Sequence, residues 1–142
     1  MNKLDAKARA QILHLLCEGS SIRAVTRLTR ASKNTVTKLL IDAGQVCASY
    51  HSRTVQNVPA KRVQCDEIWS FNYAKAKNVK AAKSAPAHAG DVWTWTAIDA
   101  DSKLMLSYMV GDRRADAATE FMHDVACRLA NCVQLTALSF AR

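Results

Sequence analysis

The chain has 142 residues, the length of one average domain or of two small ones, and its 49% hydrophobic and 23% charged residues are typical of a globular protein. The net charge of +8 lies in the N-terminal part: residues 1–64 contain 11 Lys and Arg but 3 Asp and Glu, whereas residues 65–142 contain 9 of each. This asymmetry is typical of a nucleic-acid-binding module joined to a neutral domain, and a solvated basic face is the alternative. No apolar run exceeds three residues, which excludes a membrane-spanning helix.

The N-terminus and the cysteines both indicate a reducing compartment, the cytoplasm. The first residues contain no apolar stretch that could serve as a signal peptide, so a cytoplasmic protein is expected. The five cysteines are an odd number without any Cys-x-x-Cys pair. They predict free, mostly buried thiols in a reducing compartment rather than a disulfide framework.

Residues 1–44 are expected to form three short helices. Apolar residues recur at helical spacing from Leu4 to Leu16, and the pattern stops at Gly19. Ser20 or Ser21 can cap a second helix, and Ser32 can cap a third that ends near Gly44. The expected inner faces are Ile22, Val25 and Leu28 in the second helix and Val36, Leu39 and Leu40 in the third. The three-residue break between these helices predicts a helix-turn-helix, and a helical bundle used for dimerisation is the alternative.

The outward side chains of the third helix match the chemistry of major-groove recognition. Asn can pair with adenine, Thr can contact a thymine methyl group, and Lys can reach guanine or phosphate. Arginines on the preceding helix lie where phosphate contacts would fall. The predicted DNA-binding residues are Arg23, Arg27, Lys33, Asn34, Thr35, Thr37 and Lys38. Arg30 is unusual, because this turn usually holds a glycine that can adopt a positive φ.

Residues 45–62 show no clear periodicity and are expected to be a linker, with a weak helical tendency near residues 46–51. The second half predicts strands at 63–73, 92–98 and 104–110, a helix at 114–130 and the start of a fourth strand at 133–135. A mobile connection with four lysines is expected at 72–90, and a turn at 99–102. The expected fold class is α+β, and three strands, a helix and a strand beside the first are how a ribonuclease H-like domain begins.

Asp66 and Glu67 lie inside the first predicted strand, where a carboxylate is unfavourable unless it faces solvent or serves a function. Strand alternation places them on opposite faces. Phosphoryl transfer with two Mg²⁺ ions needs converging carboxylates, but an isolated Asp-Glu pair is weak evidence for it. Asp99 and Asp101 are expected to be turn residues.

Other residues with reactive or aromatic side chains are assigned structural roles. His123 and Cys127 have metal-ligand spacing on one helix, but a metal site is not expected without two further ligands. Core positions are expected for Trp69, Trp93, Trp95 and Cys132, rather than base-stacking roles for the tryptophans.

Three segments together resemble a bacterial insertion-sequence transposase of the insertion-sequence-one family, in the branch with an N-terminal helix-turn-helix. They are Ser-Lys-Asn-Thr-Val-Thr-Lys-Leu-Leu at 32–40, Asp-Glu-Ile-Trp-Ser-Phe at 66–71 and Gly-Asp-Val-Trp-Thr-Trp-Thr-Ala-Ile-Asp-Ala at 90–100. The resemblance runs from residue 1 to about Thr136.

The resemblance implies a DDE-type enzyme with a ribonuclease H-like core, in which two Asp and one Glu hold Mg²⁺. Such an enzyme nicks the ends of its own element and joins the freed 3′-hydroxyls to target DNA. Asp66 matches the first of these catalytic, metal-binding carboxylates. The second Asp of the family stands in a Thr-Asp-Gly word directly after the fourth strand, whereas here residues 133–136 lead into Ala-Leu-Ser-Phe-Ala-Arg. The second Asp and the later Glu have no counterpart.

The expected protein is therefore a truncated transposase that is inactive in catalysis. Its domains are a helix-turn-helix at 1–44, a linker at 45–62 and an incomplete ribonuclease H-like domain at 63–142. The expected partner is double-stranded DNA at element ends, on the nucleoid in the cytoplasm, with a second copy or an intact transposase as a further partner and no membrane. The alternatives are a non-catalytic DNA-binding protein that competes with intact transposase and a degenerate fragment without a role.

Overall fold

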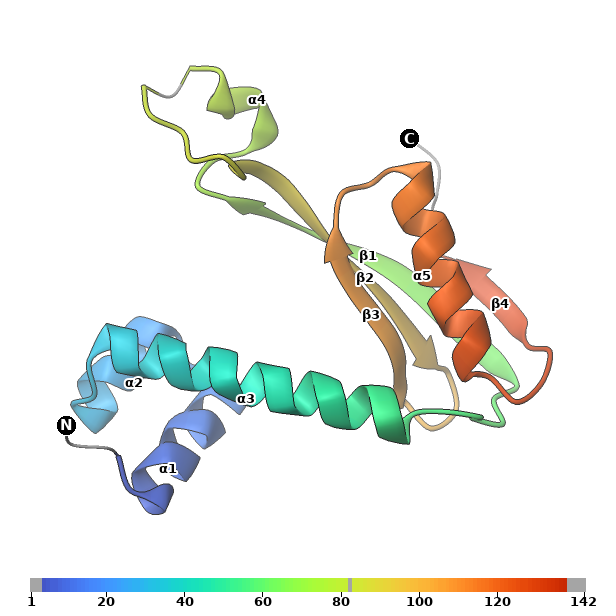
Figure 1. The fold of residues 1–142 in the computed structure, drawn as a ribbon, viewed down its shortest axis with the longest axis horizontal. Coiled ribbons are helices and arrows are strands. Elements are labelled where there is room, and N and C mark those ends of the chain that lie inside the picture. The colour runs from blue at the N-terminus through green and yellow to red at the C-terminus, as the bar shows by residue number, and fades with distance from the viewer. Residues whose placement is uncertain (1–3, 82, 138–142) are drawn as a thin grey trace. The chain divides into compact units, whose positions relative to one another are not determined.

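A computed structural model describes residues 4–81 and 83–137. The chain divides into two compact units, Met1–Thr54 and Val55–Arg142. The first is helical, and the second contains a four-stranded mixed sheet with helices (Figure 1). The expected α+β class is confirmed.

The first unit consists of α1 (Ala6–Cys17), α2 (Ile22–Thr29) and α3 (Lys33–Thr54). Each helix begins at a polar residue whose side chain accepts a hydrogen bond from a backbone N–H three residues later: Asp5 for α1, Ser21 for α2 and Ser32 for α3. Among the described residues of the unit, those that are buried form one small core: Ile12, Val25, Ala31 and Val36. Helical periodicity and caps therefore place these helices as the sequence predicts.

Two expectations for the first unit are wrong. The third helix does not end near Gly44 but continues to Thr54, and it takes up most of the expected linker. A glycine inside a helix costs only about 1 kcal/mol, and the next proline is Pro59. Leu28 and Leu40 are 64% and 41% exposed rather than inward, because the small core has no further surface to cover them.

The second unit contains the strands β1 (Arg62–Asn72), β2 (Gly90–Asp99), β3 (Met105–Gly111) and β4 (Gln134–Ala137). The spatial order is β3-β2-β1-β4, with β1–β2 and β2–β3 antiparallel and β1–β4 parallel. The short helix α4 (Ala76–Val79) lies between β1 and β2, and α5 (Ala115–Arg128) lies between β3 and β4. The predicted fourth strand beside the first is thus confirmed, and residues 138–142 lie outside the described residues.

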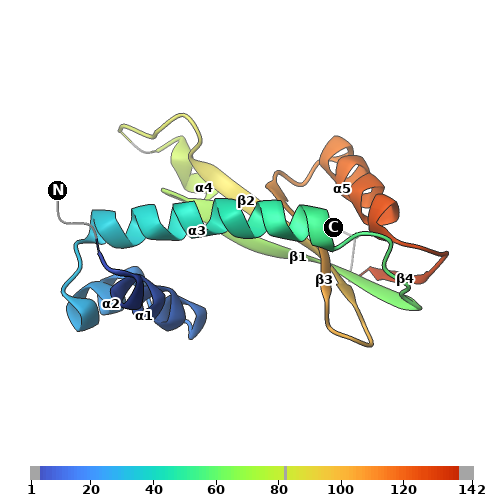
Figure 2. The ribbon, with the colours of Figure 1, turned by 60° about the horizontal axis from the view of Figure 1, so that its bottom comes forward.

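The helix α5 packs against one face of the sheet (Figure 2). Phe121 and Val125 of α5 are buried against strand residues that include Val63, Trp95 and Leu106. The rings of Phe121 and Trp95 are 5.8 Å apart. Alternation along the strands directs the odd-numbered residues of β1 to this face, so the core forms where the sheet and α5 overlap.

Beyond this overlap the expected burial fails. Trp69 is 40% exposed, since β1 and β2 continue past the last residue of β3, which pairs with Trp93. Trp95 is buried as predicted, and Trp93 is half-buried. The connection at 72–90 contains α4, so it is not irregular throughout. All five cysteines are free, as predicted, but only Cys65 is buried; the exposed ones are Cys17, Cys47, Cys127 and Cys132.

Candidate nucleic-acid interface

The first two turns of α3 present most of the side chains for which the sequence predicts DNA contacts. Val36 points into the core and is fully buried, so the opposite side of these turns faces solvent. Lys33, Asn34 and Lys38 are exposed and Thr37 is partly exposed. With two further residues they line one shallow concave patch: Lys33, Asn34, Thr37, Lys38, Ile41 and Asp42. We call this set the α3 patch.

Thr35 is not part of the α3 patch. Its hydroxyl lies 2.8 Å from the hydroxyl of Ser32, whose oxygen also accepts the N–H of Thr35 at 3.1 Å. This threonine therefore helps to form the helix cap. The predicted residues of α2, Arg23 and Arg27, are exposed on either side of the buried Val25.

The α3 patch contains an ion pair that was not predicted from the sequence. The Nζ atom of Lys38 lies 3.1 and 3.2 Å from the two carboxylate oxygens of Asp42. Both side chains are more than half exposed, so the pair contributes little to stability. The spacing of opposite charges four residues apart on a helix was the available signal.

Arg30 ends α2 in the left-handed conformation, with φ of 59° and ψ of 10°. This conformation is disfavoured for a residue with a Cβ atom, by roughly 1–2 kcal/mol. The side chain is exposed, in the break between α2 and α3. The chain thus has a strained arginine where a glycine would fit without strain.

The two acidic residues of β1 face opposite sides of the sheet. Asp66 is exposed, and its carboxylate accepts the backbone N–H of Glu67 at 2.8 Å. The described part of the parallel β1–β4 ladder ends at the pair Cys65–Ala137, one residue before Asp66. The Glu67 side chain is only 8% exposed and lies 2.5 Å from Arg113. The two carboxylates therefore do not converge on one point.

The described residues do not form a metal centre by themselves. Among residues 4–81 and 83–137, no group of three or more His, Cys, Asp or Glu side chains could hold a metal ion. The Cys127 sulfur lies 3.8 and 3.9 Å from the ring nitrogens of His123, so this pair offers only two ligands on an exposed helix surface.

The turn after β2 has the role that the sequence predicts. The Asp99 carboxylate accepts hydrogen bonds from the Ser102 hydroxyl and from the backbone N–H groups of Ser102 and Asp101. The Ser102 hydroxyl bond, more than any other contact, lowers the pKa of Asp99. Arg62 pairs with Asp101, and this bond raises its pKa. Burial raises the pKa of the Cys65 thiol. These shifts belong to the scaffold rather than to a reactive site.

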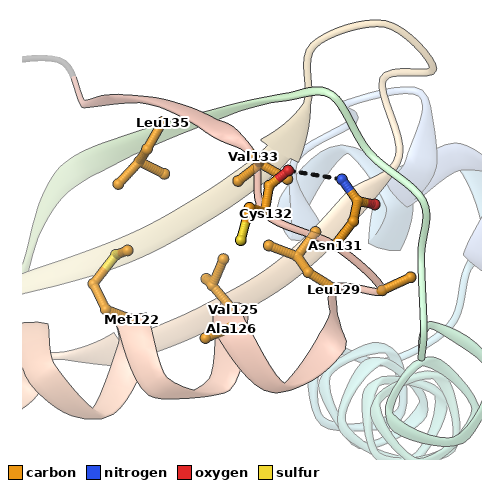
Figure 3. A pocket seen from close by; sticks show the side chains of 9 residues that line it. Met122, Val125, Ala126, Leu129, Asn131, Cys132, Val133 and Leu135 are labelled. Atoms are coloured by element: carbon orange, nitrogen blue, oxygen red, sulfur yellow. Dashed lines mark hydrogen bonds between the residues drawn. The ribbon is translucent and has the colours of Figure 1, made fainter.

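An apolar pocket of about 560 Å³ lies between α5 and β4, and sequence analysis did not predict it. Its lining comes from Met122, Val125, Ala126, Leu129, Ala130, Asn131, Cys132, Val133 and Leu135 (Figure 3). At one end the Asn131 amide donates to the carbonyl oxygen of Cys132 at 2.8 Å. The lining has no charged side chain that would select a ligand.

No protein-family model matches the chain, and a search of the curated proteins finds no match. In the described ranges, none of the helices combines the length and the apolar character needed to cross a membrane.

Proposed function

We propose that this protein is a member of the insertion-sequence-one transposase group that binds double-stranded DNA at element ends through its first unit. In this proposal α2 and α3 form a helix-turn-helix, and the α3 patch enters the major groove. The single observation that carries the proposal is the α3 patch itself: Lys33, Asn34, Thr37 and Lys38 gather on the solvent side of a capped helix. Lysine, asparagine and threonine are side chains that read base edges.

Arg30 supports the same proposal. Its side chain is exposed in the turn between α2 and α3, where an arginine can reach a phosphate. Arg23 and Arg27 on α2 add two further exposed cations. Phosphate contacts from these arginines would set the orientation of α3. In the α3 patch the lysines would add phosphate contacts, and Asn34 and Thr37 would contact base edges and determine sequence preference.

The second unit is proposed to be a ribonuclease H-like domain. The sheet order and the parallel pairing of β1 with β4 support this proposal, because they bring Asp66 next to the end of β4. The family holds Mg²⁺ at this place with three carboxylates. The described residues do not fit a complete site of this kind: Asp66 contributes one carboxylate, and Glu67 is held on the other face by Arg113.

This mismatch favours a second candidate function, a DNA-binding protein that occupies element ends without cutting them and so competes with an intact transposase. Two-metal catalysis needs ligands that hold both ions roughly 3.5–4 Å apart, which one exposed aspartate cannot do. We expect the 142 residues alone to leave DNA with element ends uncut in Mg²⁺ or Mn²⁺. Metal-dependent nicking that disappears in Asp66→Ala would reject this candidate.

The duplex-binding proposal is tested by Arg30→Gly in the full chain. Glycine relieves the left-handed strain, so the first unit should gain about 1 kcal/mol of stability while duplex binding weakens several-fold. Arg30→Lys keeps the cation and the strain, and should bind the duplex nearly as well as the parent. Measurements are urea unfolding followed by circular dichroism and fluorescence anisotropy with a labelled duplex. Undiminished binding by Arg30→Gly would contradict the role given to this arginine.

A further inference from the structure

The hairpin of β1 and β2 extends beyond the rest of the sheet. β3 ends at Gly111, which pairs with Trp93, and Trp93 in turn pairs with Trp69. From this row outward only β1 and β2 continue, to the pair Asn72–Gly90, with α4 in the loop that joins them (Figure 1). We define the arm as residues 69–81 and 83–93.

Two hydrogen bonds join the loop of the arm to its strands. The carboxylate of Asp91 accepts the backbone N–H of Ala76 at 2.9 Å, at the start of α4. The amide of Asn72 donates to the carbonyl oxygen of His88 at 3.0 Å, across the base of the loop. Hydrogen bonds thus hold both ends of the loop to the strands.

One face of the arm carries exposed aromatic rings. Trp69 and Phe71 are two residues apart on β1 and share a face, and they are 40% and 49% exposed. Their ring centroids are 5.8 Å apart, and the rings are tilted by 40°. The Nζ atom of Lys75 lies 5.0 Å from the centre of the Trp69 ring. Aromatic rings of this size normally lie in a core, so their exposure beside a cation indicates a binding surface.

The arm is also strongly basic. Residues 72–90 contain four lysines and no Asp or Glu. All four lysines are exposed: Lys75, Lys77, Lys80 and Lys83. These lysines lie in a second half whose net charge is zero, and the carboxylate of Asp91, within the arm, accepts the N–H of Ala76.

We propose that the arm binds single-stranded DNA. Unpaired bases stack on exposed aromatic rings, and lysines beside the rings neutralise the phosphates that join those bases. A paired duplex offers the lysines its phosphates but keeps its bases stacked on each other, so it cannot use Trp69 and Phe71. A second copy of the arm would fit the rings, but a symmetric contact would bring eight lysines together in like-charge repulsion. This site is separate from the duplex-binding surface proposed for the first unit.

The test uses the full chain and a labelled oligothymidylate of about 15 nucleotides, with a duplex measured in parallel. Trp69→Leu with Phe71→Leu keeps apolar residues in β1 but removes the rings, and should weaken oligothymidylate binding about tenfold. Ile68→Ala is the control, because Ile68 is 56% exposed on the opposite face of the same strand. Neither variant should change duplex binding.

A second variant depends only on exposed side chains. Replacing Lys77, Lys80 and Lys83 by Gln should weaken oligothymidylate binding and flatten its salt dependence by roughly 0.7 unit for each phosphate that is no longer neutralised. The proposal is overturned if this variant binds oligothymidylate like the parent, or if the ring variant does so while folded. It is also overturned if sedimentation shows that the ring variant abolishes self-association and leaves oligothymidylate affinity intact, since the occupant would then be a second copy. The two proposals can fail separately, because variants of the α3 patch test duplex binding by the first unit and variants of the arm test oligothymidylate binding.

Discussion

The two units of this chain differ in how much of each is core and how much is charge. The described residues 4–54 include four buried core residues, and residues 1–54 carry nine Lys and Arg against three Asp and Glu. In the second unit the described residues, 55–81 and 83–137, include nine buried core residues, and residues 55–142 carry eleven Lys and Arg against nine Asp and Glu. The first unit thus combines a small core with an excess of cations. The second unit combines a larger core with a nearly balanced charge, and four of its eleven cations lie in the arm. Because the two proposed sites lie in different units, substitutions can remove the side chains of one site without changing the other.

The largest expected effect concerns the core of the second unit. Phe121→Ala should lower the free energy of unfolding of that unit by about 3–5 kcal/mol, because the ring is 1% exposed against Trp95. All three tryptophans lie in this unit, so urea unfolding followed by tryptophan fluorescence reports on it selectively.

Ile12→Ala is the matched variant in the first unit, where Ile12 is also 1% exposed. It should change the helical circular dichroism transition and leave the fluorescence midpoint unchanged. Equal shifts of the fluorescence midpoint in both variants would show that the two units unfold together, and the comparison between them would fail.

The sequence predicts the parts of each unit that depend on local pattern. The cap at Ser32, a cap at Ser20 or Ser21 and the Asp99 turn are all visible in residue types and spacing. The place of the fourth strand beside the first was expected from the ribonuclease H-like pattern. The failures are non-local. The exposure of Trp69 depends on where β3 ends, and the pairing of Glu67 with Arg113 joins residues 46 positions apart. Local periodicity carries no information on either.

For the same reason, the sequence predicts the α3 residues of the candidate site better than it predicts the surroundings of Asp66. Four of the five residues proposed on α3 lie on one surface, because helical periodicity alone places them. Asp66 was singled out by its residue type within a strand, but its surroundings depend on the long-range β1–β4 pairing. The arm could not be predicted as a site, because four lysines in a loop are ordinary until two aromatic rings are exposed beside them.

A smaller effect is expected at the start of α3. Ser32→Ala removes the hydroxyl that caps the helix, so the first unit should lose about 1 kcal/mol and the first turn with Lys33 and Asn34 should fray. Duplex binding should weaken with it. Ser49→Ala, at an exposed position later in the same helix, serves as the control and should change neither property. If both variants change helicity and binding equally, the Ser32 hydroxyl does not have the capping role assigned to it.

Asp42→Asn should strengthen duplex binding, by less than about fivefold, because it releases Lys38 from an exposed ion pair worth at most about 1 kcal/mol. Glu18→Gln changes the net charge of the first unit by the same amount at an exposed position at the end of α1 and should have a smaller effect. Fluorescence anisotropy at fixed salt compares the two. If Glu18→Gln strengthens binding equally, the effect is one of net charge and not of the α3 patch.

The smallest effect is a pH dependence confined to the second unit. The Ser102 hydroxyl lowers the pKa of Asp99 below its unfolded value of about 3.9, so the charged carboxylate stabilises the turn. This contribution is complete above about pH 5 and is lost as the pH falls through the lower folded pKa. The difference in fluorescence-detected stability between the parent and Asp99→Asn should therefore shrink as the pH falls below about 4. A difference that grows on acidification would contradict the assigned cause.

The central claim is that the lysines of the α3 patch contribute phosphate contacts to duplex binding, beside those of the arginines, and the salt dependence of duplex binding tests it most directly. The full chain is compared with Lys33→Ala/Lys38→Ala and with Lys7→Ala/Arg9→Ala, which removes two exposed cations of the same unit from α1. We predict that the first variant flattens the slope of log affinity against log salt by about 1.8 units, roughly 0.9 for each phosphate contact, and that the second leaves it nearly unchanged. Equal slopes for both variants, or an unchanged slope for the α3 variant, would contradict the claim.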